Sequence, residues 1–161
     1  MGMWLFQNIR KNLNKKYSYD EMMNMAMQSS FTERIDPTDN TFLAPENMIE
    51  AVRAYLGKPN LPLADVLSSV YHSLAFSYDK AIKEIESISG KEIKSIHIVG
   101  GGSKDMYLNR LTSQYTGKKV YIGLSEATAT GNILSQIMYS EKITLEEARE
   151  LVKKSFSIKE V

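Results

Sequence analysis

Three consecutive glycines, Gly100, Gly101 and Gly102, are the residues of this sequence with the clearest chemical use. They follow a short apolar run, Ile93 to Val99, and precede a segment with helical spacing. Glycine adopts positive backbone torsions and has no side chain to hold a ligand off the main chain. A helix beginning next to them would add unpaired N–H groups. The pattern predicts a turn where a flat or anionic ligand approaches the backbone. A tight turn packed under a neighbouring helix would explain the same residues.

Two known phosphate-binding motifs fit the spacing around this turn poorly. A Walker loop needs Gly-Lys followed by Ser or Thr, whereas Gly102 is followed by Ser103. The dinucleotide fingerprint wants another Gly or Ala where Asp105 or Met106 stands. Glu126 lies at about the distance expected of a ribose-binding carboxylate, but past the end of the second expected strand. A Rossmann-type dinucleotide-binding fragment is therefore a disfavoured alternative.

The glycine turn stands inside one strand–helix–strand unit. The first strand is the β-branched run before the turn, a helix is expected from about Lys104 to Thr116, and a second strand over Val120 to Ile122. Strands joined in this way run parallel, and a parallel sheet needs both faces covered. A sheet of two strands cannot achieve this alone. The predicted fold class is therefore α/β. We expect further strands from elsewhere, with this chain as the C-terminal part of a larger protein.

Helices are expected over most of the remaining chain. Capping boxes mark two of them, since Ser18 precedes Glu21, and Thr144 precedes Glu147, by three residues. The methionines of one helix and the apolar stripe of the longest helix are expected to fill a core. Small residues from Ala127 to Gly131 predict a helix that packs under the glycine turn. The expected helices are about Met3 to Asn14, a second from Ser18, Pro45 to Leu56, Leu63 to Ser89, Ser125 to Tyr139 and Thr144 to Phe156.

Composition excludes several classes of function, and neither histidine indicates a catalytic one. We expect His72, on the longest helix, to be structural or solvated, and His97, in the first strand, to be a packed or hydrogen-bonded core residue. The 161 residues include no cysteine, and 20 Lys plus Arg nearly balance 19 Asp plus Glu. Cysteine zinc sites and a field that attracts polyanions are thus excluded. The apolar start is too short to span a membrane. We expect a cytoplasmic protein with no nucleic-acid or membrane partner and no catalytic or metal-binding residue in this chain.

Several segments, taken together, resemble a single known family. They look like the C-terminal domain of the FGGY carbohydrate kinases, and the similarity covers roughly residues 1 to 138. The segments that carry it are Met1 to Gln7, Ile35 to Met48, Ile96 to Ser103, Leu108-Asn109, Gly117, Glu126 to Thr128, and Gly131 to Ile133.

The resemblance implies ATP-dependent transfer of phosphate to a ketose, with L-rhamnulose as the sugar and Mg²⁺ as a further cofactor. It also implies a helix-rich, actin-like or ribonuclease H-like fold with the nucleotide between two domains, residues 1–161 belonging to the C-terminal one. Gly101 would then lie against the adenosine end of the nucleotide. Gly100 and Gly102 would shape the turn. Gln7, on the first helix, would contribute to the ATP site.

The same resemblance assigns the catalytic aspartate, the sugar-binding residues and a phosphate-binding loop to an N-terminal half that would precede Met1. We therefore expect that half as the partner of this chain, and no kinase activity from this chain alone. Related kinases often carry Asn where Asp105 stands, and a carboxylate cannot donate a hydrogen bond to adenine. The open alternative is a non-catalytic helical interaction module that exposes an apolar stripe of Trp4, Phe6 and Leu13.

Overall fold

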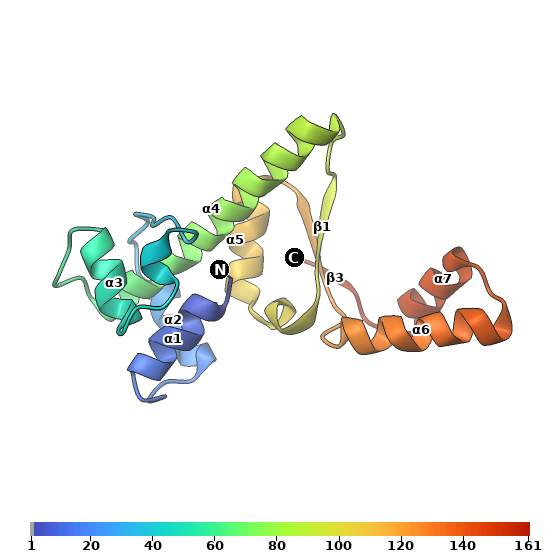
Figure 1. Cartoon of the computed structure of the whole chain (residues 1–161), viewed down its shortest axis with the longest axis horizontal. Coiled ribbons are helices and arrows are strands. Elements are labelled where there is room, and N and C mark those ends of the chain that lie inside the picture. Colours follow the sequence, from blue (N-terminus) through green and yellow to red (C-terminus); the bar gives the residue numbers. More distant parts are fainter. Residues whose placement is uncertain (1) are drawn as a thin grey trace. The chain divides into compact units, whose positions relative to one another are not determined.

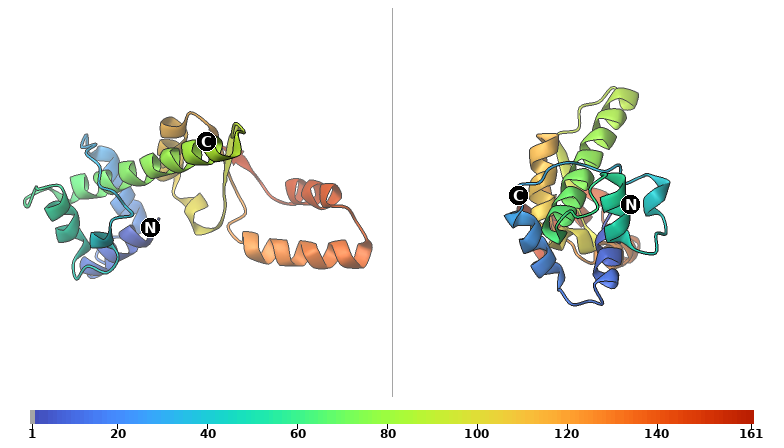
Figure 2. Two further views of the ribbon diagram at one scale, coloured as in Figure 1. Left: turned by 45° about the horizontal axis from the view of Figure 1, so that its top comes forward. Right: turned by 90° about the vertical axis from the view of Figure 1, so that its left-hand side faces the viewer.

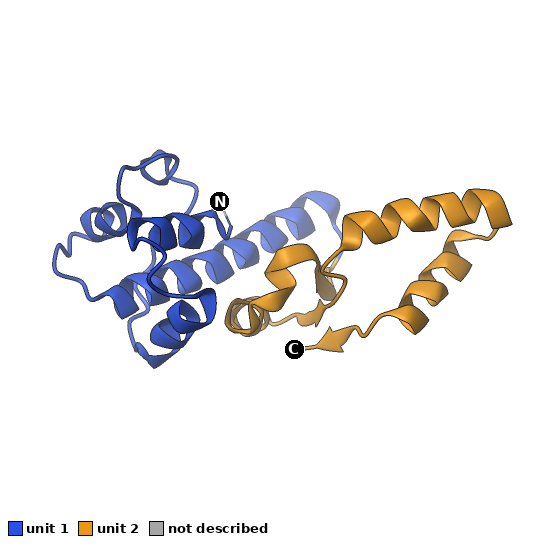
Figure 3. Ribbon diagram, turned by 90° about the horizontal axis from the view of Figure 1, so that it is seen from below, with its two compact units in different colours: residues 1–91 blue, residues 92–161 orange. Residues whose placement is uncertain are grey.

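The computed structural model describes residues 2–161, which Figure 1 traces from end to end. The chain divides into two compact units: unit 1 ends at Lys91, and unit 2 runs from Glu92 to Val161 (Figure 3). In the described part of unit 1 the regular elements are all helical, and unit 2 carries a small sheet with helices. The chain is therefore a helix-rich α/β protein, as predicted. Met1, which belongs to the apolar start of the sequence, lies outside the described residues.

Unit 1 is built around its longest helix, α4, whose bounds match the prediction. The shorter helices α1, α2 and α3 pack on α4, and α1 also contacts α3. Phe6 of α1 meets Tyr71 of α4 with ring centroids 4.3 Å apart. Met22 of α2 is buried as expected, whereas Met27 is 47% exposed, so the core prediction for that residue is wrong. The elements of unit 1 are α1 (Trp4–Asn12), α2 (Tyr19–Gln28), the 3₁₀ turn η1 (Asn40–Phe42), α3 (Met48–Tyr55) and α4 (Leu63–Ser89).

The two halves of α4 differ in burial. Its buried residues begin at Val66 and end at Asp79. The apolar stripe continues in the sequence, but Ile85 is 52% and Ile88 81% exposed. The prediction that the whole stripe fills a core is therefore wrong for the last turns. Helical spacing identifies an apolar face, but only neighbouring elements can bury it. Gly90, with φ +64°, then ends the helix in the left-handed conformation.

Buried serines of α4 hold the loop that precedes η1. Ser68 Oγ donates to the carbonyl of Phe31 at 2.7 Å, and Ser73 Oγ accepts the N–H of Ile35 at 2.9 Å. These bonds satisfy backbone groups that the loop buries against the helix. Among the described residues, the buried hydroxyl of Ser69 has no hydrogen-bond partner. The loop predicted around Asp36 is thus confirmed, apart from the short turn η1.

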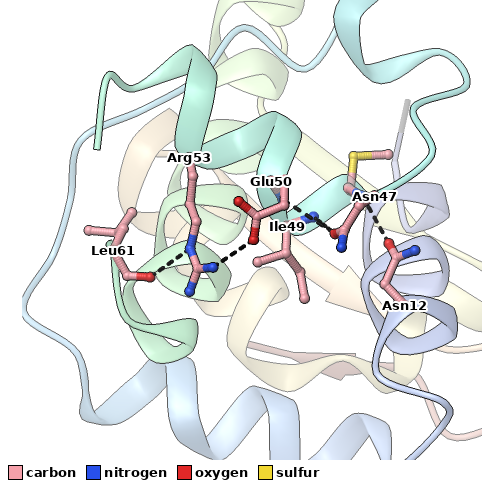
Figure 4. Close-up of polar contacts among 7 residues, drawn as sticks. Asn12, Asn47, Ile49, Glu50, Arg53 and Leu61 are labelled. Carbon is pink, nitrogen blue, oxygen red and sulfur yellow. Dashed lines mark hydrogen bonds and ion pairs between the residues drawn. The ribbon is translucent and has the colours of Figure 1, made fainter. Parts of the chain in front are cut away.

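Asparagine side chains connect α1 to α3 (Figure 4). Asn12 Oδ1 accepts the N–H of Met48 at 2.9 Å, and Asn12 Nδ2 donates to the carbonyl of Glu46 at 3.1 Å. Asn47 Oδ1 accepts the N–H groups of Ile49 and Glu50 and so caps α3. The predicted start of this helix at Pro45 is therefore wrong, because the cap that satisfies its free amides is Asn47.

The sheet of unit 2 has three strands in the order β1-β2-β3. β1 (Ser95–Ile98) and β2 (Lys119–Ile122) run parallel, which confirms the predicted strand–helix–strand unit. β3 (Lys159–Glu160) pairs antiparallel with β2. The sequence predicted two strands in this chain and further strands from elsewhere. The third strand instead comes from the C-terminal segment of the chain itself. The connecting elements are the 3₁₀ turn η2 (Gly100–Lys104) and α5 (Met106–Thr116), which packs on β2.

The helices that follow β2 form a hairpin. α6 (Ala127–Glu141) and α7 (Leu145–Ser155) contact each other and lie side by side in Figure 2. The capping box of Thr144 and Glu147 at the start of α7 is present, as is that of Ser18 and Glu21 in α2. No residue of α6 is buried. The prediction that its small residues pack under the glycine turn is therefore wrong, because a helix packed in that way would bury them.

Candidate functional site: the glycine turn of unit 2

The glycine turn connects β1 to α5 through η2. Val99 is still extended, and Gly100 then adopts φ +73°, a torsion that favours glycine. The N–H of Gly100 donates to the carbonyl of Leu124 at 3.1 Å, and the N–H of Gly123 donates to Ile98 at 3.4 Å. The position of the turn is therefore set by the segment that follows β2, at the carboxyl ends of two parallel strands. Clefts at such strand ends are common ligand sites in α/β proteins.

Gly101 and Gly102 have no comparable torsional reason to be glycine. Neither has a positive φ. A Cβ atom on Gly101 would meet no atom within 4 Å, and one on Gly102 would make an ordinary contact with Ile98 Cγ2 at 3.9 Å. Packing within the chain thus does not demand glycine at Gly101. The missing side chain leaves open space beside an exposed backbone, which is the arrangement expected where a ligand approaches closely.

Two buried polar side chains tie the turn to α5. Ser103 Oγ donates to the carbonyl of Gly100 at 2.7 Å. Asn109 Nδ2 donates to the carbonyl of Ser103 at 3.2 Å, and Asn109 is 1% exposed. The sequence alone did not indicate a role for either residue. A Ser followed by an Asn six positions later is too common a spacing to indicate a functional role.

Asp105 has a local role at the start of α5. Its carboxylate accepts the N–H of Leu108 at 3.0 Å and caps the helix. This capping role was not predicted from the sequence, although Asp is a preferred capping residue. Gly117, with φ +63°, ends the same helix. Both ends of α5 are therefore set by local caps, with Asp105 at the start and Gly117 at the end.

A shallow pocket of about 270 Å³ adjoins the turn within unit 2. Two lysines, Lys104 and Lys159, line it together with hydroxyl side chains, and no carboxylate does. Its charge therefore suits an anionic ligand. One wall depends on Gly123, which the sequence analysis did not single out, because a Cβ there would lie 3.3 Å from the carbonyl oxygen of Ser157. Only the folded chain reveals this close approach.

Gln7, the other predicted nucleotide contact, belongs to unit 1. It is exposed on α1, whereas its neighbours Leu5, Phe6 and Ile9 are buried. The alternative of an exposed apolar stripe on this helix is therefore wrong for Phe6, which is 1% exposed. Gln7 and the glycine turn lie in different units, each described by itself. Their joint role in one nucleotide site stays a prediction.

The two histidines belong to different units, His72 to unit 1 and His97 to unit 2. His97 is exposed and stacks on Tyr121 of β2 with ring centroids 5.1 Å apart, so its prediction as a packed core residue is wrong. It sits on the side of β1 opposite Ile96 and Ile98, since side chains alternate along a strand. His72 of α4 is partly buried, and burial, followed by the charge of Arg34, lowers the pKa of its imidazole.

Within residues 2–161, no three His, Asp or Glu side chains are grouped so that they would hold a metal ion. None of the helices in the same range combines the length and apolar character needed to cross a bilayer.

Comparison with known proteins identifies the family. Residues 1–140 match the C-terminal domain of the FGGY family of carbohydrate kinases. The chain therefore belongs to the FGGY family of carbohydrate kinases.

Similar curated proteins include several rhamnulokinases. That of Oceanobacillus iheyensis is 40% identical over 98% of this chain and 35% of its own length. That of Bacillus subtilis is 38% identical over 99% of this chain and 34% of its own length. That of Bacteroides thetaiotaomicron is 32% identical over 98% of this chain and 34% of its own length. The chain thus spans about a third of the length of these relatives.

Proposed function

We propose that this chain forms the adenine side of the nucleotide site of an ATP-dependent carbohydrate kinase, and that the sugar is L-rhamnulose. Membership of the FGGY family supports the reaction class, a phosphoryl transfer to a carbohydrate. The relatives named rhamnulokinase support the sugar. The observation that carries the nucleotide role is Gly101, whose backbone is exposed and whose missing side chain leaves open space.

Each predicted site residue has a specific part in this proposal. Gly101 lies against the adenosine end of the nucleotide, Gly100 provides the left-handed torsion of the turn, and Gly102 continues η2 beside β1. Gln7 adds an amide that both donates and accepts hydrogen bonds. The lysine-lined pocket beside the turn favours the approach of an anion. When bound, ATP supplies the phosphoryl group, and Mg²⁺ neutralises charge on its phosphates.

The remainder of the active site would come from a partner region. We propose that residues 1–161 belong to the C-terminal domain of an actin-like or ribonuclease H-like cytoplasmic ATPase, with the nucleotide lying between two domains. The N-terminal half of the same kinase would then provide the catalytic aspartate and the sugar site. Phosphoryl transfer depends on the positioning of such groups. The chain alone should accordingly be inactive toward L-rhamnulose, and measurable ATP-dependent phosphorylation by it would contradict this.

Calorimetric titration of the whole chain tests the nucleotide site. ADP and ATP should bind, and NAD should not. Gly101→Val should weaken ADP binding by at least about tenfold, because a branched side chain would occupy the ligand's space at the turn. Gly131→Val in α6 is the matched control, since Gly131 also lacks a positive φ and a Cβ there meets no atom within 4 Å. Binding of NAD alone would favour the Rossmann-type alternative, and binding of none of the three nucleotides would reject the proposed site.

A further inference from the structure

We propose that Ser103 and Asn109 are positioning residues that aim the N–H of Gly101 at the nucleotide. The inference rests on the proposed nucleotide role of the turn. It concerns the side chains that hold the turn in shape, whereas Gly101 itself makes the contact. The two residues form a series of hydrogen bonds that begins at Asn109, inside unit 2, and ends at the backbone of Gly100.

The first hydrogen bond of this series joins the buried Asn109 to Ser103 and is the first link. Asn109 is 1% exposed, and its Nδ2 donates to the carbonyl of Ser103 at 3.2 Å. A buried amide loses its hydrogen bonds to water, so it must find partners inside the protein. Asn109 sits on α5 beside the buried Leu108. The packing of α5 therefore fixes where its amide can reach, and that amide fixes the backbone at Ser103.

The second link acts on the glycine turn itself. Ser103 is 9% exposed, and its Oγ donates to the carbonyl oxygen of Gly100 at 2.7 Å. That carbonyl and the N–H of Gly101 belong to the same trans peptide, in which they point in opposite directions. A hydrogen bond that draws the Gly100 oxygen toward Ser103 therefore turns the Gly101 N–H to the opposite side.

The orientation matters because glycine otherwise leaves the turn free to change. Gly100, Gly101 and Gly102 have few steric limits on their torsions, so the peptide between the first two could flip at low cost. Gly101 is exposed, so its N–H lies at the surface of the turn. Held in one orientation, this donor is preorganised for an acceptor atom on the ligand, which reduces the entropy lost on binding.

Removing the second link tests the inference. In the whole chain, Ser103→Ala should weaken ADP binding by about five- to tenfold, the factor that one hydrogen bond is worth. Ser103→Thr retains the hydroxyl and should bind ADP like the unmodified chain. Ser113→Ala is the matched control, because Ser113 Oγ also donates from α5 to a backbone carbonyl, that of Lys118, at 3.2 Å. It should leave ADP binding unchanged.

Amide hydrogen exchange provides a measurement that does not require a nucleotide. Exchange across Gly100–Lys104 should accelerate severalfold in Ser103→Ala and in Asn109→Leu, and should not change in Ser113→Ala. This measurement separates the proposed function from the present inference. A protein that binds no ADP would reject the proposed function, while the exchange rates would still test the hydrogen bonds of Ser103 and Asn109. If Asn109→Leu does not fold, the comparison of Ser103→Ala with Ser103→Thr decides.

Three outcomes would overturn the inference. The first is an Ser103→Ala variant with the exchange rates of the unmodified chain at the turn. The second is a loss of thermal stability in Ser103→Ala without any change in ADP affinity, which would make the bond purely structural. The third is equal loss of ADP affinity in Ser103→Ala and Ser103→Thr, since the hydroxyl would then not be the group that matters.

Discussion

Unit 1 and unit 2 bury their apolar residues in different patterns. In unit 1, three short helices pack on α4, and every one of these helices buries apolar side chains. In unit 2, burial is confined mainly to α5 and β2, while α6 contributes no buried residue. The buried part of unit 2 is also the part that carries the glycine turn, through Ser103 and Asn109. Packing in unit 2 is therefore concentrated where it positions the candidate site.

The largest expected effect tests this difference in burial directly. Phe6→Ala should lower the free energy of unfolding by about 3–5 kcal/mol, because it removes a fully buried ring that packs on Tyr71. Ile133→Ala in α6, where the side chain is 58% exposed, should change it by less than about 0.5 kcal/mol. Denaturant unfolding monitored by circular dichroism measures both. Similar losses for the two variants would contradict the comparison.

Buried serines of α4 provide the next test, within unit 1. Ser73→Ala should cost about 1–3 kcal/mol, because it leaves the buried N–H of Ile35 without its acceptor. Ser69→Ala should be neutral or slightly stabilising, because the buried Ser69 hydroxyl has no hydrogen-bond partner within residues 2–161. The two residues lie four positions apart on the same helix, so each is a control for the other. A larger loss for Ser69→Ala in the same unfolding experiment would be inconsistent with this assignment.

Within the glycine turn, two neighbouring substitutions separate shape from ligand access. Gly100→Ala should cost about 1–2 kcal/mol of stability, because φ +73° is strained for any residue with a Cβ atom. Gly101→Ala should leave stability within about 0.5 kcal/mol, since its Cβ meets no atom within 4 Å. Thermal unfolding measures the difference. Equal losses would mean that the torsion of Gly100 is not what fixes the turn.

Substitutions in the two capping boxes should have the smallest effects, and these boxes make the stability of both units depend on pH. Ser18→Ala in unit 1 and Thr144→Ala in unit 2 should each cost about 0.5–2 kcal/mol. In the folded chain, hydrogen bonds from the backbone and hydroxyl of Ser18 lower the pKa of Glu21 below its ordinary 4.5. Thr144 does the same for Glu147. Because these folded-state pKa values are depressed, the stabilisation is present above the ordinary pKa and is lost as pH falls through the lowered values.

A pH series of unfolding experiments checks the sign. Between about pH 6 and pH 3, the gap in stability between the unmodified chain and a Glu21→Gln, Glu147→Gln double variant should narrow as the carboxylates become protonated. A gap that widens toward acid would show that these carboxylates do not act as caps. Salt should change the gap little, because the interaction is a short hydrogen bond to the backbone.

Much of the local structure could be predicted because it depends on residues close together in sequence. The span of α4, both capping boxes and the parallel pairing of β1 with β2 all follow from such patterns. Errors arose where one residue can serve two purposes. Pro45 suits the start of a helix, but Asn47 satisfies the free amides of α3, so the helix begins later.

Prediction failed for properties that distant residues decide. Ile88 has the spacing of a core position, and small residues in α6 have the composition of a packed helix, yet neither is buried. β3 has two residues, too few for any periodic signal. His97 alternates with apolar neighbours in β1, and only the covering of one sheet face decides that it is exposed.

The sequence alone determined the glycine turn, its place between a strand and a helix, and the family resemblance that the comparisons confirmed. These depend on residue types and short spacings. Tertiary structure alone decided that Gly100 needs its torsion while Gly101 leaves open space. It also decided that Ser103 and Asn109 hold the turn. The physical reason is that torsion, burial and hydrogen-bond partners depend on where α5 and the segment after β2 pack, which no short stretch of sequence specifies.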